Sequence, residues 1–272
     1  MTKDRRIAIF SNYGHWGNVD VAPESLPRPM SKMLADWWKD MPSHGGFNGA
    51  ADNDDSINIL NGNEMPTIKR CIPILDSLTL GYGLVTTAEM YVKPYTGDLN
   101  TNVPDCPQEE VVIEATHPRR LERIPSLEIS HHDYGQAMTH PLCQNSGQRL
   151  RKVFTPWRIM TPPGYSVIIT EPLNNPSKYW EIVPGVIDSD QFAPQINFMM
   201  VFKDPHFDGI VPAGTPLAQV IPFKRESWSS YISDSEEDAA ELERGGLKIF
   251  ARLNSVFRAP YKKFFWAKKE FK

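Results

Sequence analysis

Pro184-Gly185-Val186-Ile187-Asp188-Ser189-Asp190 is the stretch that decides the fold of this chain, together with Gly214-Thr215-Pro216-Leu217-Ala218-Gln219 further on. The first places an acidic pair on a tight turn between two apolar runs. The second turns the chain into another apolar run, Val220-Ile221-Pro222-Phe223. Both patterns predict hairpin corners of one compact β domain. Side chains at such corners often carry function, because the scaffold holds them in place.

Short apolar stretches bounded by Pro, Gly and polar residues recur along the rest of the chain. Strands are expected over residues 7–10, 83–92, 111–115 and 127–130. The stretch over residues 67–78 fits either a strand or a short helix. The pattern predicts a β-rich protein, all-β to α+β, with short helical decorations at both ends.

One helix is expected near the N-terminus and two near the C-terminus. Ser31 is a favourable N-cap, so residues 32–41 are predicted to be helical. The apolar stripe of this helix would comprise Met33, Leu34, Trp37 and Trp38. An acidic helix is predicted to open at residues 233–238 and to end at Gly245-Gly246, with a second short helix over residues 247–257.

The tail over residues 261–272 mixes aromatic side chains with lysines. It is predicted to pack its rings on the body of the protein or on a neighbouring subunit, with the lysines facing solvent. The alternative is a basic and aromatic clamp for nucleic acid.

Composition limits the class of protein. With 272 residues, 40% hydrophobic and 11% aromatic, the chain can bury a large core. The formal net charge of -4 gives no overall attraction to nucleic acid or anionic lipid, so neither nucleic acid nor a membrane is an expected partner. The three cysteines are odd in number and far apart, which favours a reducing, cytoplasmic setting. No apolar run reaches signal-peptide or membrane-spanning length.

Two stretches contain potential metal ligands. The Gly/Asp-rich insertion over residues 43–63 holds Asp52-Asn53-Asp54-Asp55 but lacks the glutamate and spacing of an EF-hand, so a solvated acidic loop is expected. The second is Ser130-His131-His132-Asp133, followed by His140 and Cys143. Adjacent histidines in an extended segment point to opposite faces, which hinders convergence on zinc. No metal site is predicted.

The two turn stretches, with Pro162-Pro163-Gly164-Tyr165 ahead of an apolar strand, resemble the dUTP pyrophosphatase and dCTP deaminase superfamily. That superfamily carries a PG-x-ID turn, a later G-x-x-I/L-A-Q turn and a P-x-GY strand start. The likeness covers about residues 150–226 and implies a dUTPase-like β-clip barrel. By this resemblance the chain has an N-terminal lobe over residues 1–150, a β-clip core over 151–228 and a C-terminal part over 229–272. A homo-oligomer is implied, with a trimer as the family's typical form.

The resemblance also implies a set of site residues. Asp188 and Gln219 would position an attacking water, as a general base and a hydrogen-bonding amide can. The substrate-binding residues would be Asn174, Asp190, Phe192 and Arg225. In the alternative interpretation, Asp188, Ser189 and Asp190 only cap their own turn through side-chain hydrogen bonds.

Departures from the family pattern concern phosphate binding. Where the family has a Pro-Arg-Ser motif, this chain has Thr170-Glu171-Pro172-Leu173, and Glu171 would repel phosphate. An aromatic residue should follow Asp190 directly, yet Gln191 intervenes before Phe192. The family's Gly-rich C-terminal arm is also missing.

Most of the chain also resembles an uncharacterised family of tailed-phage proteins, through residues 34–42, 67–73 and 221–228. The expected location is then the host cytoplasm or the virion. Two functions stay open. The first is a non-catalytic or degenerate β-clip module that assembles into oligomers or binds a ligand or partner, with no cofactor. The second is a divergent nucleotide pyrophosphohydrolase, using Mg²⁺ and Arg225 or a neighbouring subunit's lysine on the phosphates.

Overall fold

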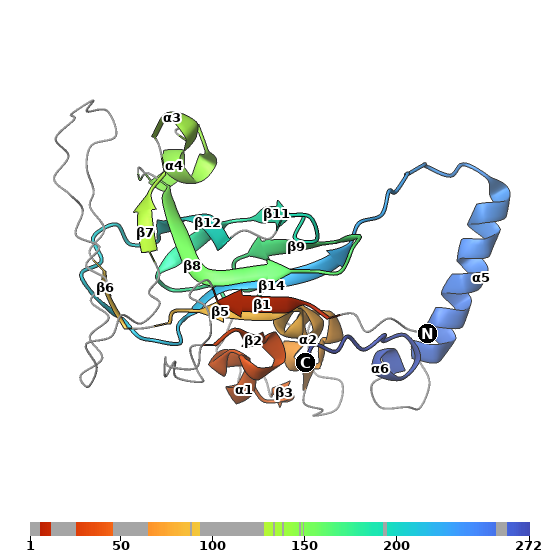
Figure 1. Ribbon diagram of the computed structural model, residues 1–272. Helices are drawn as coiled ribbons and strands as arrows, with labels where there is room; N and C mark the ends of the chain where they lie inside the picture. Colours follow the sequence, from red (N-terminus) through yellow and green to blue (C-terminus); the bar gives the residue numbers. More distant parts are fainter. Residues whose placement is uncertain are drawn as a thin grey trace. The chain divides into compact units, whose positions relative to one another are not determined.

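The computed structural model describes residues 6–11, 26–45, 65–87, 89–92, 128–132, 134–137, 139–146, 148, 150–192, 195–253 and 260–272 (Figure 1). The chain divides into two compact units. The β unit comprises Met1–Met33, Leu78–Arg225 and Phe271–Lys272, and the helical unit comprises Leu34–Ser77 and Glu226–Glu270. Residue 150, the expected end of an N-terminal lobe, lies inside the β unit.

The first sheet of the β unit is built around its longest strand, β8. Its strands are β1 (Ala8–Ser11), β7 (Glu128–His131), β8 (Arg151–Met160), β10 (Trp180–Val183) and β12 (Gln195–Phe202). All pairs are antiparallel, in the order β1-β8-β12-β10, with β7 also paired to β8. The strands predicted at residues 7–10 and 127–130 are thus confirmed as β1 and β7.

The second sheet carries the predicted site. Its strands are β2 (Arg28–Pro29), β5 (Tyr82–Val85), β9 (Tyr165–Thr170), β11 (Gly185–Ile187) and β14 (Pro216–Lys224). They are antiparallel in the order β11-β9-β14-β5-β2. Within the described ranges neither five-stranded sheet closes on itself. The β-rich class is confirmed.

The strand predicted over residues 83–92 is two strands, because the chain leaves the second sheet after β5. A separate ribbon pairs β6 (Met90–Val92) with β13 (Gly209–Val211). The buried Thr86 fixes the change of direction. Its N–H donates to the oxygen of Thr215 at 2.9 Å, and its hydroxyl donates to the oxygen of Pro212 at 2.8 Å.

Apolar faces of the two five-stranded sheets share one core. The first sheet contributes Val153, Trp157, Ile159, Trp180, Ile182, Ile196, Phe198, Met200 and Phe202. The second contributes Leu84, Val167, Ile169, Leu217, Ala218 and Val220. Most of these alternate along their strands, as the period-two geometry of a strand requires when one face is buried. Burying each large side chain contributes about 1.5–3 kcal/mol, so this core holds β9 and β14 firmly in register.

The acidic turn is a crossing between the two sheets, so the hairpin prediction is wrong. β10 and β12 belong to the first sheet, whereas β11, which lies between them in the chain, belongs to the second. Pro184 separates β10 from β11 and has no N–H to continue the ladder. A turn does form, because the N–H groups of Gln191 and Phe192 donate to the oxygen of Asp188. The stretch at Gly214 is not a hairpin either. It links β13, which belongs to the ribbon with β6, to β14 in the second sheet.

The helix predicted over residues 32–41 is not one element. The structure has a 3-10 helix η3 (Met30–Lys32) and the short helix α1 (Asp36–Asp40). Ala35 between them has φ -58° and ψ 145°, an extended conformation that separates the two. Met33 therefore lies outside any helix and is buried with η3. Trp38 is buried on α1, while Trp37 is 37% exposed, so the predicted single stripe is wrong.

The helix α5 (Glu236–Leu253) continues through Gly245-Gly246, which were predicted to end it. Neither glycine has a positive φ, so the left-handed cap that glycine commonly supplies does not form. The predicted start is correct, since the Ser235 hydroxyl accepts a hydrogen bond from the N–H of Asp238 at 3.1 Å. The next helix is α6 (Pro260–Phe264).

Within the C-terminal tail, two residues bind the helical unit of their own chain. The indole N–H of Trp266 donates to the Asp76 carboxylate at 2.9 Å, and Lys269 lies 2.7 Å from the same carboxylate. This tail therefore makes contacts with its own chain, as the first of the two predictions for residues 261–272 allowed. The nucleic-acid alternative stays untested.

Short elements complete the description. They are β3 (His44–Gly45), β4 (Met65–Pro66), η5 (Ile68–Arg70), α2 (Ile72–Thr79), α3 (Tyr134–Ala137) and α4 (Pro141–Ser146). For residues 67–78 the helical alternative is confirmed. The insertion beyond Gly45 and the strand expected at 111–115 fall outside the described residues. Among the helices that are described, none combines the length and apolar character needed to cross a membrane.

Candidate functional site

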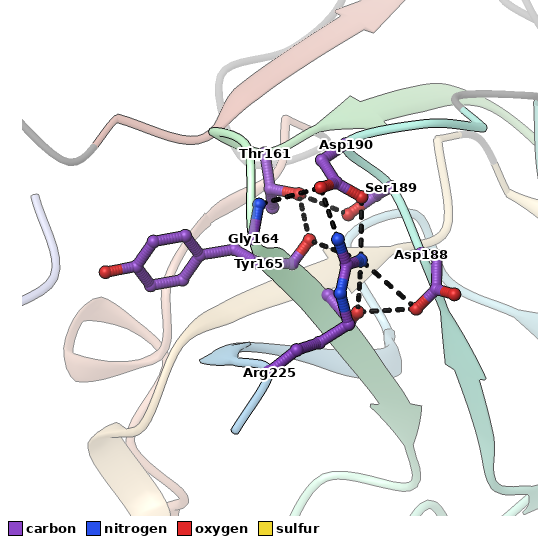
Figure 2. A network of polar contacts seen from close by, with 8 residues as sticks. Thr161, Gly164, Tyr165, Asp188, Ser189, Asp190 and Arg225 are labelled. Atoms are coloured by element: carbon purple, nitrogen blue, oxygen red, sulfur yellow. Dashed lines mark hydrogen bonds and ion pairs between the residues drawn. The ribbon is translucent and has the colours of Figure 1, made fainter. Parts of the chain in front are cut away.

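The start of β9 brings together residues that are far apart in the sequence. β9 lies between β11 and β14, with Val167 opposite Ile187 on one side and Ser166 opposite Phe223 on the other. The chain that leaves β11 enters the turn at residues 188–191, and the chain that leaves β14 reaches Arg225. These three segments form a polar cluster, called here the acidic corner: Thr161, Gly164, Ser166, Asp188, Ser189, Asp190 and Arg225. Figure 2 shows this cluster from close by.

Arg225 and Asp190 form a two-pronged ion pair. One guanidinium nitrogen of Arg225 donates to Asp190 Oδ1 at 2.7 Å, and the other donates to Oδ2 at 2.5 Å (Figure 2). The N–H of Gly164, a residue with φ +84°, also donates to Oδ2 at 2.8 Å. The hydrogen bonds from Arg225, assisted by Gly164, lower the pKa of Asp190 to about 2. Asp190 in turn raises the pKa of Arg225, so both groups are charged at neutral pH.

Asp188 occupies the open side of the same corner. Its Oδ1 accepts a hydrogen bond from the Ser166 hydroxyl at 2.6 Å and lies 3.3 Å from the nearer nitrogen of Arg225. That nitrogen also donates to the Ser166 hydroxyl at 3.0 Å. The side chain of Asp188 is 62% exposed, whereas that of Asp190 is 4% exposed. Asp188 is therefore the carboxylate of the corner that solvent reaches.

A pair of buried hydroxyls also stabilises the corner. Ser189 and Thr161 are both buried, and their hydroxyl oxygens lie 2.7 Å apart. The Thr161 hydroxyl donates to the oxygen of Tyr165 at 2.9 Å, whose ring points away from the cluster (Figure 2). The side chains of Ser189 and Asp190 thus bind residues of neighbouring segments, which the turn-capping interpretation did not include.

Gln219 lies at the opposite end of β9 and is fully buried. Its Oε1 accepts the N–H of Leu173 at 2.7 Å, and its Nε2 donates to the oxygen of Leu80 at 2.6 Å. Gln219 is paired with Thr170, whereas Asp188 is level with Ser166. Four strand residues span about 13 Å. The structure therefore does not bring Asp188 and Gln219 together within one chain.

The residues expected near phosphate lie at the Gln219 end. Asn174 is exposed and has φ 55°, in a turn closed by the N–H of Asn175 and the oxygen of Pro172. Glu171 accepts the N–H of Ser177 at 2.9 Å and forms an ion pair with Lys203 at 2.9 Å. The carboxylate at the expected phosphate position thus has its own cation.

Phe192, expected to pack on a nucleoside, is 66% exposed at the acidic corner. The six predicted site residues therefore divide into two groups. Asp188, Asp190, Phe192 and Arg225 lie at the start of β9, and Asn174 and Gln219 lie beyond its end. Sequence reasoning assigned no site role to Thr161, Gly164 and Ser166, and assigned only turn capping to Ser189. The available signal for Ser166 was a serine directly before the apolar run Val167-Ile168-Ile169 of β9.

The histidine stretch gives no metal site in the part of the chain that can be described. There, no three His, Cys, Asp or Glu side chains lie close enough together to hold an ion. His140 Nδ1 accepts the N–H of Leu142 at 3.2 Å, and Cys143 is buried. The side chains of His131 and Asp133, and all of the Asp52–Asp55 stretch, lie outside the described residues.

No protein-family model matches this chain, and no curated protein matches its sequence.

Proposed function

We propose that the protein is a non-catalytic module of the β-clip type that acts in assembly or partner binding. We also propose that its acidic corner is a structural lock, meaning a set of contacts that stabilises the fold and does not bind a substrate. The observation that carries the proposal is the two-pronged contact of Arg225 with Asp190. A triphosphate is bound by cations or N–H groups whose donors are not already used by other residues. At this corner, Asp190 already takes one donor from each terminal nitrogen of Arg225 and the N–H of Gly164.

The charge of the corner supports the same conclusion. Asp188 and Asp190 against Arg225 leave one net negative charge, which opposes the approach of a polyanion. At the other end of β9, the oxygen and the nitrogen of the Gln219 amide each bind a backbone group. A buried amide that binds two backbone groups holds a loop in place. To position a water instead, it would have to give up one of these hydrogen bonds.

The alternative, a divergent nucleotide pyrophosphohydrolase using Mg²⁺, is favoured by one observation. Asp188 is largely exposed and oriented by the Ser166 hydroxyl, as a carboxylate acting as general base would be. In that case Asp188 would act without Gln219, and Arg225 would have to leave Asp190 to reach phosphate.

The test is release of pyrophosphate and ammonia from a panel of deoxynucleoside triphosphates with Mg²⁺. The wild type, Asp188→Asn and the exposed control Asp234→Asn are compared at equal concentration. We expect all three to match the rate without protein. Turnover in the wild type and in Asp234→Asn that is lost in Asp188→Asn, with the melting temperature unchanged, would establish the enzyme instead.

The phage resemblance supplies a setting for such a module, in the host cytoplasm or in the virion. That setting, the β-clip barrel and a trimeric state all stay predictions. A mass measurement of the purified protein bears on the oligomer directly.

A further inference from the structure

The segment from Trp228 through α5 exposes an unusual amount of apolar surface. Between 47% and 98% of the surface of each of its large apolar residues is exposed. These residues are Trp228, Tyr231, Ile232, Leu242, Leu247, Ile249 and Phe250. Soluble proteins seldom leave contiguous apolar surface uncovered unless it is a binding surface. The exposure is therefore a reason to look for what covers α5.

The spacing on α5 is that of a helix-pairing seam. Ala239, Leu242, Gly246 and Ile249 follow one another at intervals of three, four and three residues. This is the a and d pattern of a coiled coil, in which one narrow stripe faces a second helix. A second helix is thus a better geometric fit than a flat surface.

The two glycines point to close approach by that second helix. Glycine in a helix interior is less favourable than alanine, so Gly245 and Gly246 weaken α5 in isolation. A Cβ added at either position would meet no atom within 4 Å, so packing among the residues that the structure describes does not require glycine. Gly246 lies on the seam, where a missing side chain makes room for a large residue of a facing helix.

The charges on α5 are separated along its length. Its first eight residues hold five carboxylates, and Arg244 and Lys248 follow. α6, which contacts α5, adds Lys262 and Lys263 (Figure 1). Two parallel copies would place the carboxylates together, whereas two antiparallel copies place each acidic half beside a basic half. The acidic half also disfavours an anionic lipid surface as the occupant.

We infer that α5 pairs antiparallel with α5 of a second copy of this chain, about a two-fold axis level with Arg244 and next to Gly245. In this arrangement Leu242 of each copy lies against Gly246 of the other. The inference rests on the assembly form of the proposed function and names the partner and the surface. The interface is self-complementary, as two-fold symmetry requires.

The first experiment measures the mass of the full chain by sedimentation equilibrium over a range of concentrations. Leu242→Lys places a charge on the seam, and Ala251→Lys adds the same charge on the opposite face of α5. We expect the mass of Leu242→Lys to be half that of the wild type, with association at least tenfold weaker, and Ala251→Lys to match the wild type. Circular dichroism checks that helix content is retained. A monomeric wild type, or equal masses for the two variants, would overturn the pairing.

The second experiment tests the antiparallel direction by disulfide formation. Gly245→Cys lies beside the axis, and Asp238→Cys lies one heptad earlier on the same side of the helix. We expect Gly245→Cys to form a cross-linked dimer above the wild-type level, which accounts for the three native cysteines, and Asp238→Cys not to do so. Equal cross-linking at both positions would show a parallel pair, and none at Gly245→Cys would show no pair, so either result overturns the inference.

The two proposals fail separately. Nucleotide turnover would end the non-catalytic proposal without changing the mass of any variant. A monomer would end the pairing of α5 without producing turnover.

Discussion

Replacing Gln219 by methionine is the change that best separates a structural role from a catalytic one. Methionine has nearly the same length and fills the same space, but it cannot replace either hydrogen bond. The N–H of Leu173 and the oxygen of Leu80 would lose their partner. Each polar group stranded in this way costs about 1–3 kcal/mol. We expect Gln219→Met to lower the free energy of unfolding by about 2–6 kcal/mol.

The measurement is urea unfolding followed by fluorescence, because the β unit contains buried tryptophans. The control is Gln144→Met on the exposed surface of α4, for which a change within about 0.5 kcal/mol is expected. An unchanged midpoint for Gln219→Met would refute the reasoning, since it would mean that the two contacts contribute nothing to the fold.

Gln219→Glu adds a signature in pH. The new carboxyl can still accept from Leu173, but its second oxygen faces the oxygen of Leu80. Burial and this repulsion raise the pKa of the carboxyl above its ordinary value of about 4.3. Because the pKa is raised in the folded state, ionisation of the new carboxyl does not destabilise the variant below about pH 4. The loss of stability relative to the wild type then grows as the pH rises from about 4 towards the raised pKa. A loss independent of pH would contradict the geometry.

Three further predictions concern other contacts. Asp190 has a pKa lowered to about 2, so its ion pair stabilises the fold above about pH 4, and this stability disappears as the pH falls towards 2. The difference in melting temperature between wild type and Asp190→Asn should shrink over that interval; a constant difference would contradict the pairing. Gly81→Ala places a Cβ 2.1 Å from a backbone oxygen of β14 at φ +71° and should cost about 3 kcal/mol or more in chemical denaturation, whereas Gly185→Ala, in open space, should cost less than about 1 kcal/mol. Trp266→Phe removes the indole bond to Asp76 and should cost about 1 kcal/mol; no change in the unfolding of the helical unit would show that the bond is not formed.

Local patterns in the sequence were sufficient for much of the β unit. β1 and β7 were predicted from short apolar stretches, whereas β9 was expected through the resemblance, from Pro162-Pro163-Gly164-Tyr165 ahead of an apolar strand. Such signals act within a few residues and depend on side-chain alternation. They do not show which strand pairs with which. The acidic turn was therefore predicted as a hairpin, although its flanking strands belong to different sheets.

The acidic corner depended on contacts that local patterns do not contain. Asp190 and Arg225 are 35 positions apart and meet only because β11 and β14 flank the same strand. The pairing of Gln219 with Leu80 spans 139 positions. The resemblance named these residues but not their partners, and the partners determine whether their polar atoms are available to a ligand.

The prediction for helix α5 failed for a different reason, because a local rule was given too much weight. A pair of glycines usually ends a helix, but the cost of each in a helix interior is only about 1 kcal/mol. The flanking residues continue the helical pattern and outweigh that cost. No atom of the described residues lies within 4 Å of a Cβ built at either glycine.

The account depends most on the commitment of Arg225 to Asp190. Titration calorimetry of the wild type with a deoxynucleoside triphosphate and Mg²⁺ tests it directly, with Arg225→Gln alongside. We predict no saturable heat for either protein. Saturable binding to the wild type that Arg225→Gln abolishes would show that Arg225 leaves Asp190 to bind phosphate, and would contradict the structural lock.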